Sequence, residues 1–188
     1  MQETEYKFLV DKKKFYEILE LVKSLYPESQ AKEKVQINYY YDTDDEYLLS
    51  RCTTLRIRQT EDDLKLELKE SQLLTGDDFS TCTETSRKID SLRSDITLES
   101  GKFAWIPFTL QGNLVTRRYS IKPCESLSID FDVNCYLGKC DYEIEMEFTE
   151  NGKKGTKLLV EKLELLEYKN KTGGKARRFF LAKSEIKL

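Results

Sequence analysis

Charged and uncharged residues alternate along three separate segments of this chain. Residues 3–7 have the sequence Glu-Thr-Glu-Tyr-Lys, residues 55–58 have the sequence Leu-Arg-Ile-Arg, and residues 141–148 alternate four acidic residues with apolar ones. In an extended strand, successive side chains point to opposite faces. Each of these segments would therefore form a strand with one ionic face and one face that is largely apolar.

An antiparallel sheet at a protein surface would show a similar alternation, with its apolar face on a core and its charges in water. In this chain, however, acidic and basic strands are segregated along the sequence instead of each strand mixing both signs. If the sheet closed on itself with the ionic faces inward, its lumen would hold carboxylates opposite arginines and lysines. Such a lumen is suited to a polyanion that binds together with metal ions.

The length and net charge limit what this chain can bind. With 188 residues, of which 35% are charged, and no low-complexity tract, it is expected to form a single domain over residues 1–188. Its formal net charge is -3. Nonspecific binding to nucleic acid needs a broad basic surface, so no nucleic-acid partner is expected. Any basic groups that bind a ligand must be clustered locally.

The sequence contains no apolar run long enough to span a membrane, and charged residues occupy the start in place of a signal peptide. We therefore expect a cytoplasmic protein with no membrane partner. Its five cysteines are an odd number without CxxC spacing. This favours reduced thiols over a disulfide framework or a zinc site.

The chain has no histidine. This excludes histidine-dependent catalytic triads, HExxH zinc sites and histidine general bases within the chain. It also has neither a Walker-type glycine loop nor a GxGxxG motif. Phosphate recognition would therefore depend on side chains instead of a helix N-terminus.

Apolar spacing and turn residues predict many strands and few helices. A helix capped by Asp11 is expected to end before Pro27, and further helices are expected over residues 86–100 and 153–168. A loop is expected over residues 71–80, and Gly173 and Gly174 introduce a basic tail. Strands are expected over residues 2–10, 36–42, 55–59, 64–69, 114–122, 127–133 and 142–149. This content predicts an α+β domain built on a barrel or a highly curved sheet.

These residues also resemble the CYTH, or triphosphate tunnel metalloenzyme, superfamily. Residues 3–7 look like its ExExK signature. Six later segments resemble its further motifs in order: 38–43, 55–58, 66–69, 116–118, 136–138 and 141–145. The resemblance spans nearly the whole chain and is closest to small bacterial proteins of the Firmicute type. It implies an eight-stranded antiparallel β-barrel that forms a triphosphate tunnel, with flanking helices.

The resemblance also implies which residues act in the tunnel. Lys7 and Glu145 would be catalytic. Metal ligands for Mg²⁺ or Mn²⁺ would be Glu3, Glu5, Asp132, Glu143 and Glu145, with Glu84 as an additional candidate acid. Substrate would be bound by Lys7, Arg56, Arg58, Lys69, Arg117, Arg118, Lys175 and Arg178. The spacing leaves open which of Arg117 and Arg118, and which of Lys175 and Arg178, faces the tunnel.

The chemistry needs these residue types independently of any family. Hard divalent cations prefer carboxylate oxygens and water, and they bridge phosphate oxygens. Arginine offers paired planar donors to phosphate, and lysine supplies a compact charge. Because phosphoryl transfer depends mainly on positioning and charge stabilisation, acidic strands opposite basic ones could orient a linear triphosphate for attack by water.

The sequence therefore predicts a divalent-metal-dependent hydrolase of inorganic triphosphate or of a small organic triphosphate, such as thiamine or nucleoside triphosphate. A class IV-type adenylate cyclase, in which a ribose hydroxyl replaces water as the nucleophile, is one alternative. A noncatalytic sensor of triphosphate or polyphosphate is another. The sequence leaves the oligomeric state open between monomer and homodimer.

Three individual features have a structural interpretation. Glu147 is expected to continue an exposed strand face, and Glu67 could pair with Lys65 at the surface, which would add little stability. The tyrosines at residues 39–41 are expected to pack the barrel, although one hydroxyl could line the ligand site.

Overall fold

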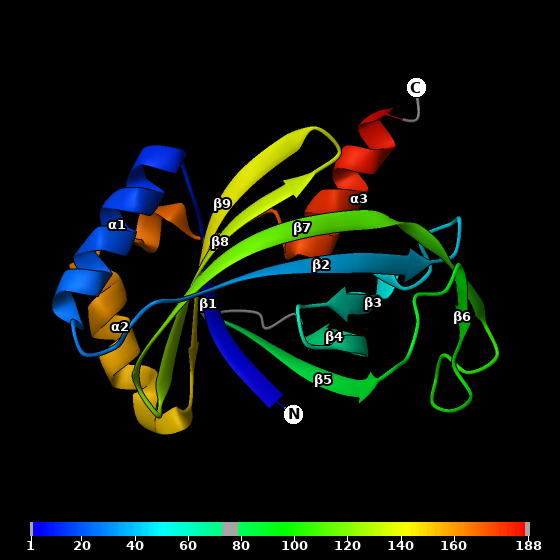
Figure 1. The fold of residues 1–188 in the computed structure, drawn as a ribbon, viewed down its shortest axis with the longest axis horizontal. Coiled ribbons are helices and arrows are strands. Elements are labelled where there is room, and N and C mark those ends of the chain that lie inside the picture. Colours follow the sequence, from blue (N-terminus) through cyan, green and yellow to red (C-terminus); the bar gives the residue numbers. More distant parts are fainter. Residues whose placement is uncertain (1, 73–78, 187–188) are drawn as a thin grey trace.

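Eight antiparallel strands close into a barrel (Figure 1). The computed structural model describes residues 2–72 and 79–186. The strands found there are β1 (Gln2–Val10), β2 (Lys32–Asp42), β3 (Thr53–Gln59), β4 (Leu64–Gln72), β5 (Ser80–Lys88), β6 (Asp95–Thr97), β7 (Pro107–Cys124), β8 (Leu127–Tyr136) and β9 (Lys139–Phe148). Their order around the barrel is β2, β3, β4, β5, β1, β9, β8 and β7, and β7 pairs again with β2. The predicted barrel with flanking helices is confirmed.

The β2–β7 pair closes the barrel over an unusually long register, from Lys32 opposite Ser120 to Asp42 opposite Thr109. A bulge interrupts this register where Gly112 lies opposite Tyr40. Gly112 has a φ of 141°, and a Cβ atom there would come within 2.6 Å of the Phe179 ring. Glycine at this position lets the C-terminal helix pack closely against the barrel wall.

Three α-helices are found in the described part of the chain: α1 (Lys12–Leu25), α2 (Lys153–Lys162) and α3 (Lys175–Ile186). The Asp11 side chain caps α1 by accepting a hydrogen bond from the Lys14 amide, as its position predicts. Helices α1 and α2 lie together at one end of the barrel, whereas α3 lies beside β7, β8 and β9 (Figure 1). None of the described helices is long and apolar enough to cross a membrane.

The buried apolar side chains form three clusters: two include helix residues, and the third, which includes Leu55, Ile57 and Phe108, packs strands β3 and β7 near β6. Phe15, Ile18 and Val22 of α1 pack against outward-facing residues of the barrel, including Phe8 and Phe131. A separate cluster joins α3 to the wall through Phe179, Phe180, Ala176, Tyr40, Leu114 and Tyr136. Tyr40 and Tyr41 are both fully buried, in agreement with the predicted packing role of the tyrosine run.

The hairpin between β8 and β9 turns at Leu137 and Gly138, which both have positive φ values, 48° and 76°. This geometry matches a two-residue type I′ turn. A disulfide joins Cys135 and Cys140 across the hairpin, and the other three cysteines are free. The expectation of reduced thiols is therefore wrong for this pair, because strand pairing places residues five apart directly opposite one another.

Several sequence-based element assignments are wrong. Residues 86–100 form no helix; instead they contain the end of β5 and the short strand β6. The predicted helix over 153–168 ends at Lys162, because Glu164 takes a left-handed backbone with a φ of 54°. The basic tail after Gly174 forms α3. Residues 71–72 and 80 belong to β4 and β5, and residues 73–78 of the expected loop lie outside the described residues.

Candidate active site

The barrel lumen holds a cavity of about 450 Å³. Its walls come from strands on all sides of the barrel and from the start of α3. Ten of the predicted site residues line it: Glu3, Glu5, Lys7, Arg56, Arg58, Lys69, Glu84, Arg118, Glu145 and Lys175. The alternating strands of the sequence therefore turn their ionic faces into one cavity.

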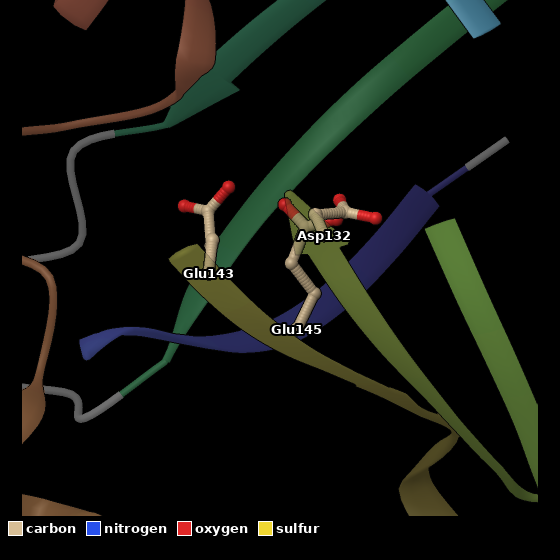
Figure 2. A group of neighbouring side chains, drawn as sticks. All are labelled: Asp132, Glu143 and Glu145. Carbon is tan, nitrogen blue, oxygen red and sulfur yellow. The ribbon is translucent and has the colours of Figure 1, made fainter. Parts of the chain in front are cut away.

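Three buried carboxylates come together on neighbouring strands at one side of the lumen (Figure 2). Asp132 lies on β8 directly opposite Glu143 on β9, and Glu145 follows two residues later on the same face. One oxygen atom from each carboxylate lies within 4.8 Å of the others. We call these three residues the acidic cluster.

The ammonium group of Lys175 occupies the centre of the acidic cluster. Its Nζ atom lies 2.8 Å from Asp132 Oδ2, 2.5 Å from Glu143 Oε2 and 2.8 Å from Glu145 Oε1. Lys175 is the first residue of α3, so docking of this helix on the barrel wall carries a cation into the lumen. The acidic cluster is thus shaped to surround a positive charge.

Electrostatics hold the acidic cluster in its ionised form. Burial opposes ionisation of Glu143, but the nearby charges of Lys175 and Arg178 outweigh it and lower the pKa of Glu143 to about 2. Burial also opposes ionisation of Glu145, and there Lys175, Lys7 and Arg118 together hold the pKa well below its ordinary value. Both carboxylates are therefore negative at neutral pH, as metal ligands must be.

Arg118 and Arg117 point to opposite sides of β7. Arg118 donates to Asp130, Asp132 and Glu145, which lie on β8 and β9, and it lines the cavity. Arg117 instead pairs with Glu33 on the outer surface, with 54% of its side chain exposed. The alternation of the strand resolves this ambiguity of the sequence in favour of Arg118, and it places Arg117 outside the lumen.

Lys175 and Arg178 also differ in position, because only Lys175 lines the cavity. Lys175 reaches the cavity, whereas Arg178 lies behind the acidic cluster, where its guanidinium pairs with Asp141 at 2.8 Å and with Glu143 at 3.0 Å. Arg178 therefore contacts a carboxylate of the acidic cluster without lining the cavity itself. Its position makes it a support for Glu143.

A second group of ion pairs lines the wall formed by β3, β4 and β5. Arg56 donates to Glu67 at 2.7 Å and to Glu84 at 3.3 Å, and Arg58 lies 3.4 Å from the same Glu67 carboxylate. The surface interpretation of Glu67 is wrong, because this residue is buried and its partners are lumenal arginines. Two arginines thus share one carboxylate, which leaves donor groups available to an anion.

The N-terminal acids lie on β1, between these two groups. Lys69 contacts Glu3 at 2.9 Å and Glu5 at 3.6 Å. Lys7 bridges Glu5 at 2.9 Å and Glu145 at 2.5 Å, and so connects β1 to the acidic cluster. Burial opposes the charge on Lys7, but Glu145 and Glu5 outweigh it and raise its pKa well above the ordinary value. Glu3 and Glu5 are thus separate from the acidic cluster and connected to it through a lysine.

Sequence reasoning missed three acids that contact arginine side chains of the predicted site: Asp130, Asp141 and Glu67. Asp130 lies two residues before Asp132 on β8, so both side chains point to the same face of the strand. The alternation that identified the other ionic faces could therefore have identified Asp130. Asp141 begins the acidic alternation of β9 and contacts Arg178. Glu67 lies between two lysines of β4, and its true partners became apparent only from the pairing of β3 with β4.

Comparisons with known proteins agree with this arrangement. The family model for the CYTH domain matches residues 1–180. The chain belongs to the CYTH family. A candidate adenylate cyclase from Bacillus halodurans is similar in structure, with 25% identity, a TM-score of 0.69, and coverage of 95% of this chain and 97% of the other. No match was found among curated proteins.

Two more distant structures share the CYTH fold. A candidate adenylyl cyclase from Hippeastrum, described as having a dominant triphosphatase activity, has 23% identity, a TM-score of 0.69, and coverage of 97% of this chain and 96% of that protein. The capping-enzyme triphosphatase of Mimivirus has 13% identity, a TM-score of 0.57, and coverage of 86% and 88%. At these identities the likeness concerns the fold.

Glu147 lies on the cavity wall of this CYTH barrel, so the expectation of an exposed position is wrong. Burial, with the nearby charges of Glu5 and Glu145, raises the pKa of Glu147 from 4.5 to about 7. The folded chain therefore binds a proton more tightly than the unfolded chain does. This stabilising contribution is complete below pH 4.5 and is lost as the pH rises through about 7.

We therefore compare the free energy of unfolding of Glu147→Gln with that of wild type in the metal-free chain. The variant is expected to gain about 1–3 kcal/mol more over wild type at pH 8 than at pH 4. Glutamine is neutral at every pH and removes the repulsion that Glu147 feels when ionised. Urea unfolding in the presence of a chelator at both pH values measures this difference. A stability difference between variant and wild type that is independent of pH would contradict the assignment.

Proposed function

We propose that this CYTH protein is a divalent-metal-dependent hydrolase that binds inorganic triphosphate, or a small organic triphosphate, in the barrel lumen. The observation that carries the proposal is the opposition of two walls in one cavity. Arg56, Arg58 and Lys69 line one wall, and Glu145 and Lys175 line another. Asp132 and Glu143 are fully buried outside the cavity lining, and with Glu145 they surround the Lys175 ammonium. A linear polyanion with an associated cation matches both walls at once.

The acidic cluster fits a hard divalent cation. Its three donors are carboxylate oxygens, they lie close enough to share one ion, and they already surround the Lys175 ammonium. Mg²⁺ or Mn²⁺ bound there would neutralise negative charge on phosphoryl oxygens. Glu3 and Glu5 offer two further carboxylates on β1, held by Lys69 and Lys7.

The residues of the chain would bind and orient the phosphate groups. Arg56 and Arg58 present guanidinium donors on one strand, and Lys69 lies on the strand paired with it. Lys7 contacts Glu145 directly and would touch the reacting phosphoryl group beside the acidic cluster. Release of Lys175 from the acidic cluster would free an ammonium to bind a phosphoryl oxygen. The barrel wall shields these side chains in part from bulk water, which strengthens each of these interactions.

Two other functions use the same walls. The comparisons include candidate cyclases as well as triphosphatases, and both chemistries act on a bound triphosphate group. In a cyclase, a ribose hydroxyl attacks the phosphorus and pyrophosphate leaves. A noncatalytic sensor would bind the same anion without turnover. We favour hydrolysis because the contacts that carry the proposal all concern phosphate and a cation, and none concerns a nucleoside.

A panel of substrates tests this choice. Inorganic triphosphate, thiamine triphosphate and ATP are each incubated with the protein and with Mg²⁺ or Mn²⁺, and orthophosphate, pyrophosphate and cyclic AMP are measured. We expect orthophosphate from inorganic triphosphate at the highest rate. Cyclic AMP as the main product would establish the cyclase, and tight binding without any product would establish the sensor.

The opposite orientations of Arg58 and Arg117 provide a matched pair of variants. Replacement of Arg58 by alanine is expected to weaken binding of inorganic triphosphate about tenfold to a hundredfold, because a charge-assisted contact is lost in the ground state and in the transition state. Replacement of Arg117 removes the same charge from the outer surface and should change binding by less than about threefold.

Calorimetric titration with the methylene-bridged analogue of inorganic triphosphate measures both affinities without turnover. Equal losses in the two variants would show that overall charge, and not the lumenal position, controls binding. Such a result would remove Arg58 from the proposed site.

A further inference from the structure

The amide group of Asn38 presents an unused hydrogen-bond donor in the lumen. Asn38 lies on β2, is 1% exposed and lines the cavity. Its Oδ1 atom accepts a hydrogen bond from Arg58 Nε at 3.3 Å, directly across the β2–β3 pair. Its Nδ2 atom is buried and has no hydrogen-bond partner among the described residues.

The Arg58 contact fixes the orientation of this amide. A guanidinium nitrogen can only donate, so the oxygen of Asn38 must face Arg58, and the NH₂ group must face the other way. A buried donor without a partner destabilises the folded state, because it has lost its hydrogen bonds to water and gained none in return. Buried polar groups in native proteins are nearly all paired, so each exception calls for a physical reason.

Other buried polar groups in the chain show that Asn38 is exceptional. Asn134 is also fully buried, but its oxygen accepts from Thr116 at 2.7 Å and its NH₂ group donates to Asp141 at 2.9 Å. The Tyr40 hydroxyl is the other unpaired buried group in the described part of the chain. It packs among Phe179 and Phe180 and, unlike Asn38, is absent from the cavity lining.

The surroundings of Asn38 identify the chemistry that would satisfy its donor. The polar contact of Asn38 is Arg58 on β3. Arg56 lies two residues before Arg58 on β3 and points to the same face of that strand. Glu67 and Glu84 offset much of the charge of these arginines, but the guanidinium donors that these carboxylates leave unused can still bind an anion there. A phosphoryl oxygen can accept several hydrogen bonds at once, and it can therefore take one from an arginine and another from the amide.

We propose that the NH₂ group of Asn38 donates a hydrogen bond to a non-bridging oxygen of the phosphoryl group that Arg58 binds. The proposal rests on the proposed function, because it takes the ligand to be a triphosphate. Asn38 then has two roles in binding: its oxygen positions Arg58 and its nitrogen contacts the substrate. The unpaired donor of the free protein becomes paired when the substrate enters.

Two substitutions of Asn38 separate these roles. Asn38→Asp keeps an oxygen for Arg58 and removes the donor, whereas Asn38→Leu has a similar size and removes both. Gln36→Glu is the matched control for charge, because Gln36 lies two residues earlier on the same strand and also lines the buried cavity wall. Calorimetry with the methylene-bridged triphosphate analogue and Mg²⁺ measures affinity, and thermal unfolding without ligand measures stability.

We expect both Asn38 variants to bind the analogue about tenfold to a hundredfold more weakly than wild type, because each loses a hydrogen bond to a charged group. Gln36→Glu should lose clearly less than Asn38→Asp. The free Asn38→Leu variant should unfold at the wild-type temperature or above it, because it removes a donor that has no partner, and Arg58 keeps its Glu67 contact when it loses the Asn38 oxygen.

Each other outcome overturns the inference in a distinct way. Wild-type affinity in Asn38→Asp with a loss in Asn38→Leu would mean that only the positioning of Arg58 matters. Losses confined to the two carboxylate variants would mean charge repulsion alone. Full affinity in both Asn38 variants, with a loss in Arg58→Ala, would reject the Asn38 contact and leave the proposed function standing. Failure of the wild type to bind the analogue would reject the proposed function and the inference together.

Discussion

Replacement of Lys175 by methionine is expected to destabilise the metal-free chain by about 3–5 kcal/mol. Methionine keeps most of the length of the side chain and removes its charge. Asp132, Glu143 and Glu145 would then lose the ammonium that contacts all three of them. Buried charges that lose their partner are among the most costly defects that a single substitution can create.

The same variant should recover stability when a divalent cation is added, because the ion replaces the missing positive charge. Urea unfolding in EDTA and in millimolar Mg²⁺ measures both effects. Lys157→Met on α2 is the control, since Lys157 is exposed and its loss should change stability by less than about 0.5 kcal/mol. Equal stability of the two variants in EDTA would show that Lys175 does not compensate the acidic cluster.

Replacement of Glu145 by glutamine is expected to lower turnover of triphosphate about a hundredfold to a thousandfold and to change triphosphate affinity only about threefold or less. The substitution removes one negative oxygen from the acidic cluster and leaves Arg56, Arg58 and Lys69 in place. A residue that acts mainly on the transition state lowers kcat without a matching loss of binding.

Steady-state kinetics combined with calorimetry of the unreactive analogue separates the two quantities. Glu150→Gln, an exposed change of the same kind just after β9, is the control and should match wild type. Loss of affinity in Glu145→Gln as large as the loss of turnover would assign Glu145 to ground-state binding instead of catalysis.

Much of the candidate site could be predicted from the sequence because strand periodicity is local information. The alternation along β1, β3 and β9 identified faces that the barrel brings into one cavity. The choice between Arg117 and Arg118 needed the pairing of β7 with β8, which places Arg118 opposite Asp132. A one-residue shift in register would exchange the two arginines, so neighbouring residues alone could not decide between them.

Two elements that build the site escaped prediction for different reasons. Strand β5 carries Cys82 and Glu84 among small polar residues, so it lacks the apolar alternation that marks a strand, and its pairing with β1 and β4 forms it. Helix α3 begins after two glycines and has basic residues at its start, which resemble a charged tail. Its apolar residues gain a partner surface only after the barrel closes.

The unpaired donor of Asn38 also lies beyond sequence reasoning. An asparagine in a strand gives no sign of whether its amide will find partners. That depends on β3 beside it, on the closure of β2 against β7, and on the cavity that the closed barrel encloses. The CYTH resemblance places Asn38 at the start of a motif, and the structure adds that its amide donor is buried at the cavity without a partner among the described residues.

The most direct test of the central claim is phosphorus NMR of inorganic triphosphate incubated with the protein. The account predicts that Mg²⁺ or Mn²⁺ supports conversion to equal amounts of orthophosphate and pyrophosphate, and that excess EDTA stops the reaction. Glu145→Gln should give the same products at a rate about a hundredfold to a thousandfold lower. An unchanged triphosphate spectrum with every metal, or full turnover in EDTA, would contradict the claim that the lumen is a metal-dependent triphosphatase.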